Sequence, residues 1–212
     1  MSRLIYTLLL IMLSHTSASA IQYRFSHLST KDGLSHNSVL CIRQDAHGFM
    51  WIATRDGLNR YDGHLCKQYE PINSNVGFAN FYTTLEACDS MMWIGSHMGL
   101  YCYDELNDAI LPFSLPQGPD TQELPTGYIC DIDIVEQNVY ILTTSALWCY
   151  NMKTRQLEKF NFEEISEPEH CPELPVTMCA DSQGNIWLGG RKSRLSLFCP
   201  NQRKIVASLA IT

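Results

Sequence analysis

Residues 39–63 contain three short apolar runs separated by two polar turns. The first run ends at Asp-Ala-His-Gly (45–48), the second ends at Thr-Arg-Asp-Gly (54–57), and the third begins at Leu58. β-Branched and aromatic residues dominate the runs, and turns rich in Asp, Asn and Gly typically join antiparallel strands. The pattern therefore predicts three short strands connected by tight turns.

The same pattern recurs along the rest of the chain. Residues 89–104 repeat it with a shorter first turn, residues 181–190 repeat its middle closely, and residues 128–151 form a weaker copy. One aromatic residue stands at the equivalent place in each second run: Trp51, Trp93, Tyr140 and Trp187. Their spacings of 42, 47 and 47 residues match the length of a four-stranded propeller blade and not that of a helical repeat.

Each unit ends in a further alternating segment that we expect to be its fourth strand. These segments are residues 64–70, 108–115, 155–162 and 203–210, and the complete units span approximately residues 34–72, 80–116, 126–163 and 175–210. Gln22–Leu28 has the same character and is predicted to be an extra outer strand, which would close a blade whose inner strands lie at the far end of a longer chain. The sequence thus predicts an all-β fold over residues 21–212, a β-propeller fragment of about four four-stranded blades of a normally seven-bladed propeller.

The first 20 residues resemble a secretory signal peptide. Arg3 supplies the positive flank, Leu4–Leu13 is apolar, and the small residues Ala18-Ser19-Ala20 form a cleavage site. We predict cleavage after Ala20, a periplasmic or otherwise exported location, and no membrane span in the mature chain. An uncleaved membrane anchor is the alternative, although the apolar run is shorter than the roughly 20 residues that a bilayer span needs.

Composition narrows the range of partners. The chain has 15 Lys and Arg against 22 Asp and Glu, a formal net charge of −7. Binding to nucleic acid requires a basic face opposite the phosphates, so the acidic balance argues against nucleic acid as a partner.

The 9 cysteines raise the question of disulfides, but an odd number cannot pair completely within one molecule. Cys102 and Cys149 fall at the same third-strand position of successive units, and Cys41, Cys130 and Cys179 fall in first strands. Equivalent places of adjacent blades are expected to lie farther apart than the about 7 Å between Cα atoms that a disulfide tolerates. We therefore predict that most cysteines are free thiols in the core.

The first unit resembles the opening blade of the two-component regulator propeller family. The resemblance rests on residues 33–39 (Gly-Leu-Ser-His-Asn-Ser-Val), Gly48-Phe49-Met50-Trp51, and residues 54–63 (Thr-Arg-Asp-Gly-Leu-Asn-Arg-Tyr-Asp-Gly). It is strong in the first unit, good in the second and fourth, and weak in the third.

This resemblance implies an exported sensor region of a hybrid histidine kinase, in which oligosaccharide fragments bind the propellers and bias the kinase. The family's pattern also implies about fourteen blades, an immunoglobulin-like domain, a membrane helix and a kinase core. This chain has four units and no phosphoacceptor or ATP-binding motif, so we expect no enzymatic activity from it and no cofactor.

The hairpins between second and third strands all open on one rim of a propeller, and this rim gives the candidate ligand site. The residues just before the turn are Arg55 and Asp56, His97 and Met98, Thr144 and Ser145, and Arg191 and Lys192. Arg and Asp side chains there could bind sugar hydroxyls or a carboxylated sugar, so Arg55, Asp56, His97, Arg191 and Lys192 are the candidate ligand-binding residues. The alternative is that these residues are solvated hairpin tips with no ligand-binding role.

Two other classes of function remain open. A sialidase-like, glycan-cleaving propeller would need two carboxyl groups flanking the scissile bond, for which Asp104-Glu105 and Glu163-Glu164 are weak candidates. A scaffold for protein–protein interaction would use the open edge of the arc for further blades or self-association. The histidines are scattered, and His170-Cys171 lacks a second pair at ligand spacing, so no metal site is expected.

Overall fold

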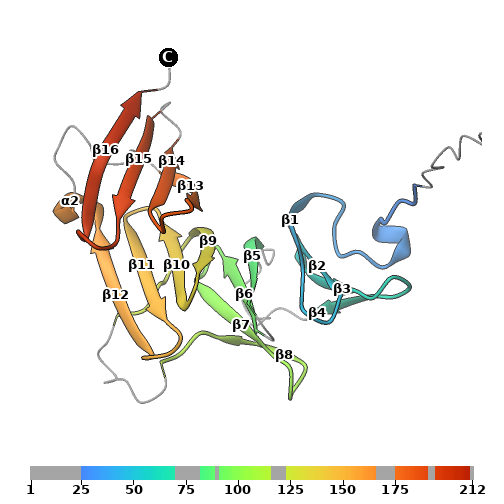
Figure 1. The fold of residues 1–212 in the computed structure, drawn as a ribbon. Helices are drawn as coiled ribbons and strands as arrows, with labels where there is room; N and C mark the ends of the chain where they lie inside the picture. The colour runs from blue at the N-terminus through green and yellow to red at the C-terminus, as the bar shows by residue number, and fades with distance from the viewer. Residues whose placement is uncertain are drawn as a thin grey trace, which may run out of the picture.

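The computed structural model describes residues 25–69, 82–88, 91–115, 123–165, 175–190 and 194–210. They form four four-stranded antiparallel sheets that follow one another in chain order across Figure 1. Blade one contains β1 (Val39–Gln44), β2 (Met50–Thr54), β3 (Gly57–Tyr61) and β4 (Cys66–Tyr69). Blade two contains β5 (Tyr82–Cys88), β6 (Met91–Ser96), β7 (Leu100–Asp104) and β8 (Ala109–Pro112). Blade three contains β9 (Ile129–Val135), β10 (Asn138–Thr143), β11 (Ala146–Asn151) and β12 (Gln156–Asn161). Blade four contains β13 (Pro175–Ala180), β14 (Ile186–Gly190), β15 (Arg194–Cys199) and β16 (Lys204–Ala210).

Strand order within each sheet follows the chain, so every blade is an up-and-down meander. The first strands contact one another from blade to blade, β1 with β5, β5 with β9, and β9 with β13. They are therefore the inner strands, and the fourth strands are the outer ones. This arrangement confirms the predicted all-β propeller built from four-stranded units.

Two aspartates shape equivalent turns between first and second strands. Asp45 Oδ1 accepts hydrogen bonds from the backbone N–H groups of His47 and Phe49, and Asp181 Oδ1 accepts them from Gln183 and Asn185. Gly48 and Gly184 adopt positive φ values of 89° and 79°, which a side chain would strain. The carboxylates are thus used by the turns themselves, as expected for a structural Asp turn.

A hydroxyl group closes the hairpin between second and third strands in three of the blades. Thr54 Oγ1, Ser96 Oγ and Thr143 Oγ1 each donate to a carbonyl three residues later, at 2.8, 3.1 and 2.9 Å. The accepting residue is a glycine with φ of 140° in blades one and two, Gly57 and Gly99, but Ala146 in blade three. Ala146 does not have a positive φ, so the backbone of the third hairpin differs from that of the first two.

Three aromatic residues pack at each boundary between neighbouring blades. The first interface (blades one and two) joins Trp51 and Tyr69 to Tyr103, with the Trp51 and Tyr103 ring centroids 4.7 Å apart. The middle interface (blades two and three) joins Trp93 and Phe113 to Tyr150 at 5.1–5.7 Å. The repeated residues Trp51 and Trp93 thus serve inter-blade packing, and they are 0% and 1% exposed.

The third interface (blades three and four) uses smaller rings at the same places. Tyr140 is buried in one apolar cluster with Phe160 of blade three and Phe198 of blade four, and the Phe160 and Phe198 centroids lie 5.0 Å apart. Trp187 has the same position in blade four but is only half-buried, since no described strand packs on that face of the sheet.

Two expectations need correction or refinement. The outer strand expected over residues 22–28 is not seen in its described part, because Phe25–Leu28 have no regular structure and lead into the short 3-10 helix η1 (Thr30–Asp32). A strand requires a hydrogen-bonded partner, and no described strand pairs with this segment. The short helix α2 (Phe162–Ile165) was also not predicted. Residues 1–24, including the predicted signal peptide, lie outside the described residues.

The cysteines agree with the prediction in their bonding but not in their burial. All those that the structure describes are free thiols. Most are only half-buried, and Cys179 is exposed. Cys41, Cys102, Cys130 and Cys149 are partly buried and pack against the apolar clusters without being among their buried members.

Candidate ligand-binding pocket

The predicted rim residues lie in exposed turns that bond within their own blade. The backbone N–H of Arg55 donates to Ser38 O at 3.0 Å, and that of Asp56 donates to Thr54 Oγ1 at 3.2 Å. His97 lies half-buried in the β6–β7 turn. Arg191 and Lys192 lie outside the described residues, so the structure does not place them beside the others. The rim site remains a prediction.

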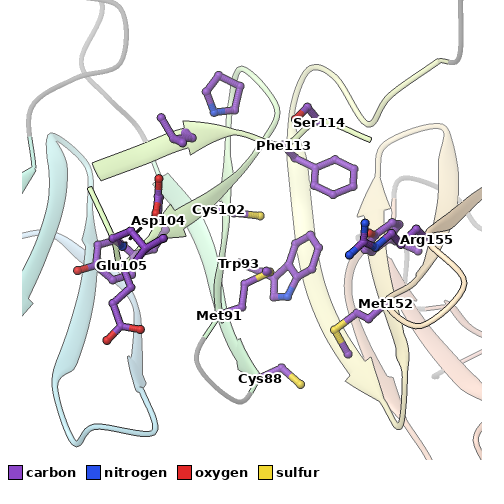
Figure 2. Close-up of a pocket in the computed structure, with 15 residues that line it drawn as sticks. Cys88, Met91, Trp93, Cys102, Asp104, Glu105, Phe113, Ser114, Met152 and Arg155 are labelled. Atoms are coloured by element: carbon purple, nitrogen blue, oxygen red, sulfur yellow. Dashed lines mark hydrogen bonds between the residues drawn. The ribbon is translucent and has the colours of Figure 1, made fainter. Parts of the chain in front are cut away.

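A pocket of about 640 Å³ lies instead at the middle interface (Figure 2). Its lining comes from β5–β8 of blade two and from β11 with the β11–β12 turn of blade three, and it extends along the strands from Glu105 and Leu106 in the β7–β8 turn to Phe113 and Ser114 after β8. Its size is within the range of small-molecule sites. The lining residues are Cys88, Met91, Trp93, Cys102, Tyr103, Asp104, Glu105, Leu106, Leu111, Pro112, Phe113, Ser114, Tyr150, Met152 and Arg155.

The aromatic triad of the middle interface forms the floor of this pocket. Trp93 lies on β6 and Tyr150 on β11, while Phe113 follows β8 and is held by its backbone N–H, which donates to Leu100 O at 2.9 Å. Figure 2 shows the Trp93 indole between Met91 and Met152. Thioether side chains are flexible and pack adaptably on rings, so this part of the wall can adjust to a ligand.

Arg155 provides the positive charge of the pocket. It ends the β11–β12 turn with a φ of 61°, its N–H donates to Asn151 O at 2.7 Å, and Asn151 Oδ1 accepts from the N–H groups of Lys153 and Thr154. Among the described residues, no carboxylate is within 4.0 Å of its guanidinium. Burial raises the pKa of Tyr150, and the charge of Arg155 acts in the opposite direction. The side chain is thus fixed at its base and unpaired at its tip.

The acidic residues lie on the other side of the pocket (Figure 2). Asp104 accepts hydrogen bonds from the Leu106 N–H and from Asn107 Nδ2, and the Asn107 contact lowers the pKa of this carboxyl. Glu105 lies 3.4 Å from His47 Nε2. A general acid for glycoside cleavage needs a raised pKa, so the environment of Asp104 is the opposite of what that role requires.

Trp93 carries a buried donor without a partner. Its Nε1 is buried and makes no hydrogen bond among the described residues. The equivalent Nε1 of Trp51 donates to Asp45 Oδ2 at 2.7 Å. A buried N–H that loses its bond to water costs about 1–3 kcal/mol unless another acceptor replaces it. The Trp93 N–H is thus an unsatisfied donor in the pocket wall, which an acceptor on a ligand would reach only if the side chains that cover it moved.

The Cys102 thiol of the pocket is not suited to nucleophilic chemistry. Cys102 lies opposite Trp93 in the β6–β7 ladder, and burial raises its pKa to about 12. A thiol with such a pKa is protonated at neutral pH and is a poor nucleophile. In the part of the chain that the structure describes, no group of three or more His, Cys, Asp or Glu side chains could hold a metal ion.

Apart from Asp104 and Glu105, which the sequence offers as weak carboxylate candidates, the pocket residues were missed at the level of sequence. The residue opposite the Trp place in the third strand is Arg60 in blade one, Cys102 in blade two, Cys149 in blade three and Leu197 in blade four. This position therefore varies from blade to blade, and its small residue in blade two is only a weak signal for a cavity.

Comparisons with known proteins identify the repeat. A family model described as two component regulator propeller matches residues 33–56. A stretch of 45 residues, 21% of this chain, is 51% identical to histidine kinase P4 of Formosa agariphila, of which it covers 3%. Within the described residues, no helix combines the length and apolar character that a bilayer span requires.

Solved structures show the same fold. The extracellular domain of the hybrid two component system BT3049 from B. thetaiotaomicron matches with a TM-score of 0.70 and 23% identity over 87% of this chain. The extracellular domain of the one component system BT4673 from the same organism matches with a TM-score of 0.64 and 21% identity over 93% of this chain. The present chain spans 26% and 27% of their lengths.

Proposed function

We propose that this chain, a two component regulator propeller, is part of the exported sensor region of a signalling receptor and binds a small-molecule ligand between its second and third blades. The family match at residues 33–56 supports the sensor role. The observation that carries the binding site is the pocket of about 640 Å³, with its aromatic floor and its unpaired donors.

Oligosaccharides are the ligand class that we propose. Sugars present apolar ring faces and hydroxyl groups together, and the pocket offers the aromatic triad together with Ser114, Asp104 and Glu105. Aromatic walls with a few polar groups are the usual composition of small-molecule sites. The chain's own role is recognition without catalysis, and the kinase chemistry belongs to other parts of such receptors.

Calorimetry with a matched pair of blocking variants tests this proposal. Leu106 lines the pocket and is 97% exposed, so Leu106→Arg fills the pocket entrance without disturbing the core. Leu65 is 74% exposed in the equivalent turn of blade one, away from the pocket, and Leu65→Arg is the control. We expect a panel of neutral and acidic oligosaccharides to yield at least one that binds the full chain and the control but not Leu106→Arg. Equal binding by both variants, together with loss on Arg55→Ala, would move the site to the predicted rim.

Exposed apolar residues at both ends of the arc favour a second candidate, a scaffold for protein–protein interaction. Val39, Leu40 and Ile42 of β1 are 40%, 42% and 49% exposed, and Leu209 of β16 is 54% exposed. Such surfaces pack on further blades or on a second copy. Size-exclusion chromatography with light scattering tests this, and a monomer at all concentrations would contradict self-association.

A further inference from the structure

Each blade interface has an equivalent pair of positions on the outer strand and on the turn of the next blade. The two positions carry opposite charges at the first and third interfaces but not at the middle one. In the first interface, Lys67 of β4 forms an ion pair with Asp108 of blade two. In the third interface, Glu158 of β12 forms one with Arg203 of blade four, at 3.1 Å. Each pair links an outer strand to the β7–β8 or β15–β16 turn of the next blade. The outer strands are thus tied together by complementary charges at both ends of the arc.

Register establishes that these positions are equivalent. In each blade, one third-strand residue lies opposite the Trp place, and the outer-strand residue of interest pairs with that third-strand residue. These outer-strand residues are Lys67, Leu111 and Glu158 in blades one to three. The turn residue adopts positive φ in every case, 48° in Asp108, 61° in Arg155 and 56° in Arg203. At the middle interface the pair is therefore Leu111 and Arg155, a cation facing an aliphatic side chain.

Arg155 lies in the pocket together with the indole N–H of Trp93, and neither group has a partner among the residues that the structure describes. Both groups are donors, and both line the same cavity. The Trp93 donor is 99% buried, so its missing partner is not replaced by solvent. The flexible Met91 and Met152 side chains flank this indole, and their movement would expose it to a ligand acceptor (Figure 2). This side of the pocket therefore offers hydrogen-bond donors, which suits an acceptor group on a ligand.

We propose that the pocket recognises a carboxylate carried on a ring. The carboxylate would pair with Arg155, and the ring would lie along the aromatic floor. This inference rests on the proposed function, because it assigns the chemistry of the ligand that the same pocket binds. A single guanidinium matches one carboxylate in a bidentate pair. A phosphate dianion fits less well, since Asp104 and Glu105 on the opposite side would repel the second charge.

Two kinds of molecule carry this chemistry, hexuronic acid sugars and aromatic carboxylic acids. Asp104, Glu105 and Ser114 can accept hydrogen bonds from hydroxyl groups, which sugars supply and simple aromatic acids lack. Hexuronate oligosaccharides are therefore the favoured source. Benzoate serves as the aromatic acid, and neutral hexose oligosaccharides of the same length serve as the uncharged comparison.

The test is calorimetric titration of the full chain with the three probes, using Arg155→Gln and Arg203→Gln as a matched pair. Both arginines adopt positive φ in equivalent turns, so the two substitutions make the same chemical and backbone change. We expect hexuronate oligosaccharides to bind at least about tenfold more tightly than neutral ones. Arg155→Gln should remove most of that difference and leave neutral sugars within about twofold, while Arg203→Gln should change neither affinity.

Each outcome decides between the two proposals. Equal affinity for charged and neutral sugars that Leu106→Arg abolishes would overturn the carboxylate inference and leave the binding site intact. Binding of benzoate alone, lost in Arg155→Gln, would support the carboxylate and replace the sugar by an aromatic acid. No binding of hexuronates or benzoate at millimolar concentration would overturn the inference. Unchanged thermal unfolding of Arg155→Gln confirms that the variant is folded, and Arg155→Lys should retain part of the preference.

Discussion

The first and middle interfaces are built on the same aromatic triad but are filled in different ways. In the first, the Arg60 guanidinium lies 4.8 Å from the Phe49 ring centre and 5.7 Å from that of Trp51, and it bonds to Tyr103. In the middle, Cys102 and Met91 stand at the places of Arg60 and Phe49, and the pocket opens there.

The difference shows where a propeller can vary without losing its fold. The position opposite the Trp place faces outward between blades, so its side chain decides whether the space is filled or open. The inner strands are coupled separately, for example by Arg43 of β1, which pairs with Glu86 of β5 at 2.7 Å. The space between two blades can therefore be filled at one interface and form a pocket at the next.

The largest expected contrast in unfolding free energy is between variants of Trp51 and Trp93. Trp51→Phe deletes the hydrogen bond to the Asp45 carboxylate and should lower the free energy of unfolding by about 2–3 kcal/mol. Trp93→Phe deletes an N–H without a partner among the described residues, so its cost should be about 1 kcal/mol, from lost ring volume alone. Urea unfolding of both variants measures the contrast, and equal losses would contradict it.

The second-largest contrast in unfolding free energy is expected between variants of Arg60 and Arg155. Arg60 has only 20% of its side chain exposed and contacts four aromatic rings and Asp108. Arg60→Met should therefore cost about 2 kcal/mol in unfolding free energy. Arg155 is exposed and unpaired among the described residues, so Arg155→Met should stay within about 0.5 kcal/mol. A comparable loss in both would mean that Arg155 supports the fold and does not serve a ligand.

Acid should destabilise the first interface in particular, because protonation of Asp108 removes its stabilising charge there. Its hydrogen bond from Lys67, then those from Tyr69 and Tyr103 and the charge of Arg60, lower its pKa from 3.8 to about 2, against the opposing effect of burial. Because the folded pKa is depressed, the stabilisation is present in full above pH 3.8 and is lost as the pH falls toward about 2.

The variant Asp108→Asn isolates this contribution. It removes the carboxyl, so its melting temperature should fall less steeply than that of the unmodified chain over the same acidic window. The effect should be smaller than that of Arg60→Met, since the Asp108 side chain is 43% exposed and solvent screens it. Arg155→Asn, in the equivalent turn, should leave the acid dependence unchanged. Parallel curves for Asp108→Asn and the unmodified chain would contradict the assignment.

The periodic parts of this structure could be predicted from the sequence, and the pocket could not. Trp51, Trp93 and the Asp45 turn repeat at a fixed phase, because every blade must bury the same face and close the same hairpins. The pocket depends on Trp93 and Arg155, which belong to different blades and meet only through packing. Differences between equivalent positions, such as Arg60 in blade one and Cys102 in blade two, become informative once register shows which positions are equivalent.

The predicted rim residues illustrate the same limit. Topology correctly places Arg55 and Asp56 in an exposed hairpin, but exposure alone does not create a site. Their backbone groups bond to Ser38 and Thr54 of the same blade, and neither residue lines the pocket between blades two and three. The rim site stays a prediction, and charged hairpin tips give no information about a pocket between sheets.

The smallest expected effect comes from giving the middle interface the charged pair of the first. Leu111 is 46% exposed and stands at the place of Lys67, and Arg155 stands at the place of Asp108. Leu111→Lys with Arg155→Asp should show a favourable coupling energy of about 0.5 kcal/mol in a double-mutant cycle, because a solvent-exposed ion pair contributes little. The double variant should also lose the preference for hexuronates, since the cation that receives the carboxylate is replaced by an anion.

The same cycle on Glu158 and Arg203, as Glu158→Ala and Arg203→Ala, provides the reference for a natural pair at this position. A coupling near zero in the engineered pair, beside a normal value in the natural one, would show that the two turns are not geometrically equivalent.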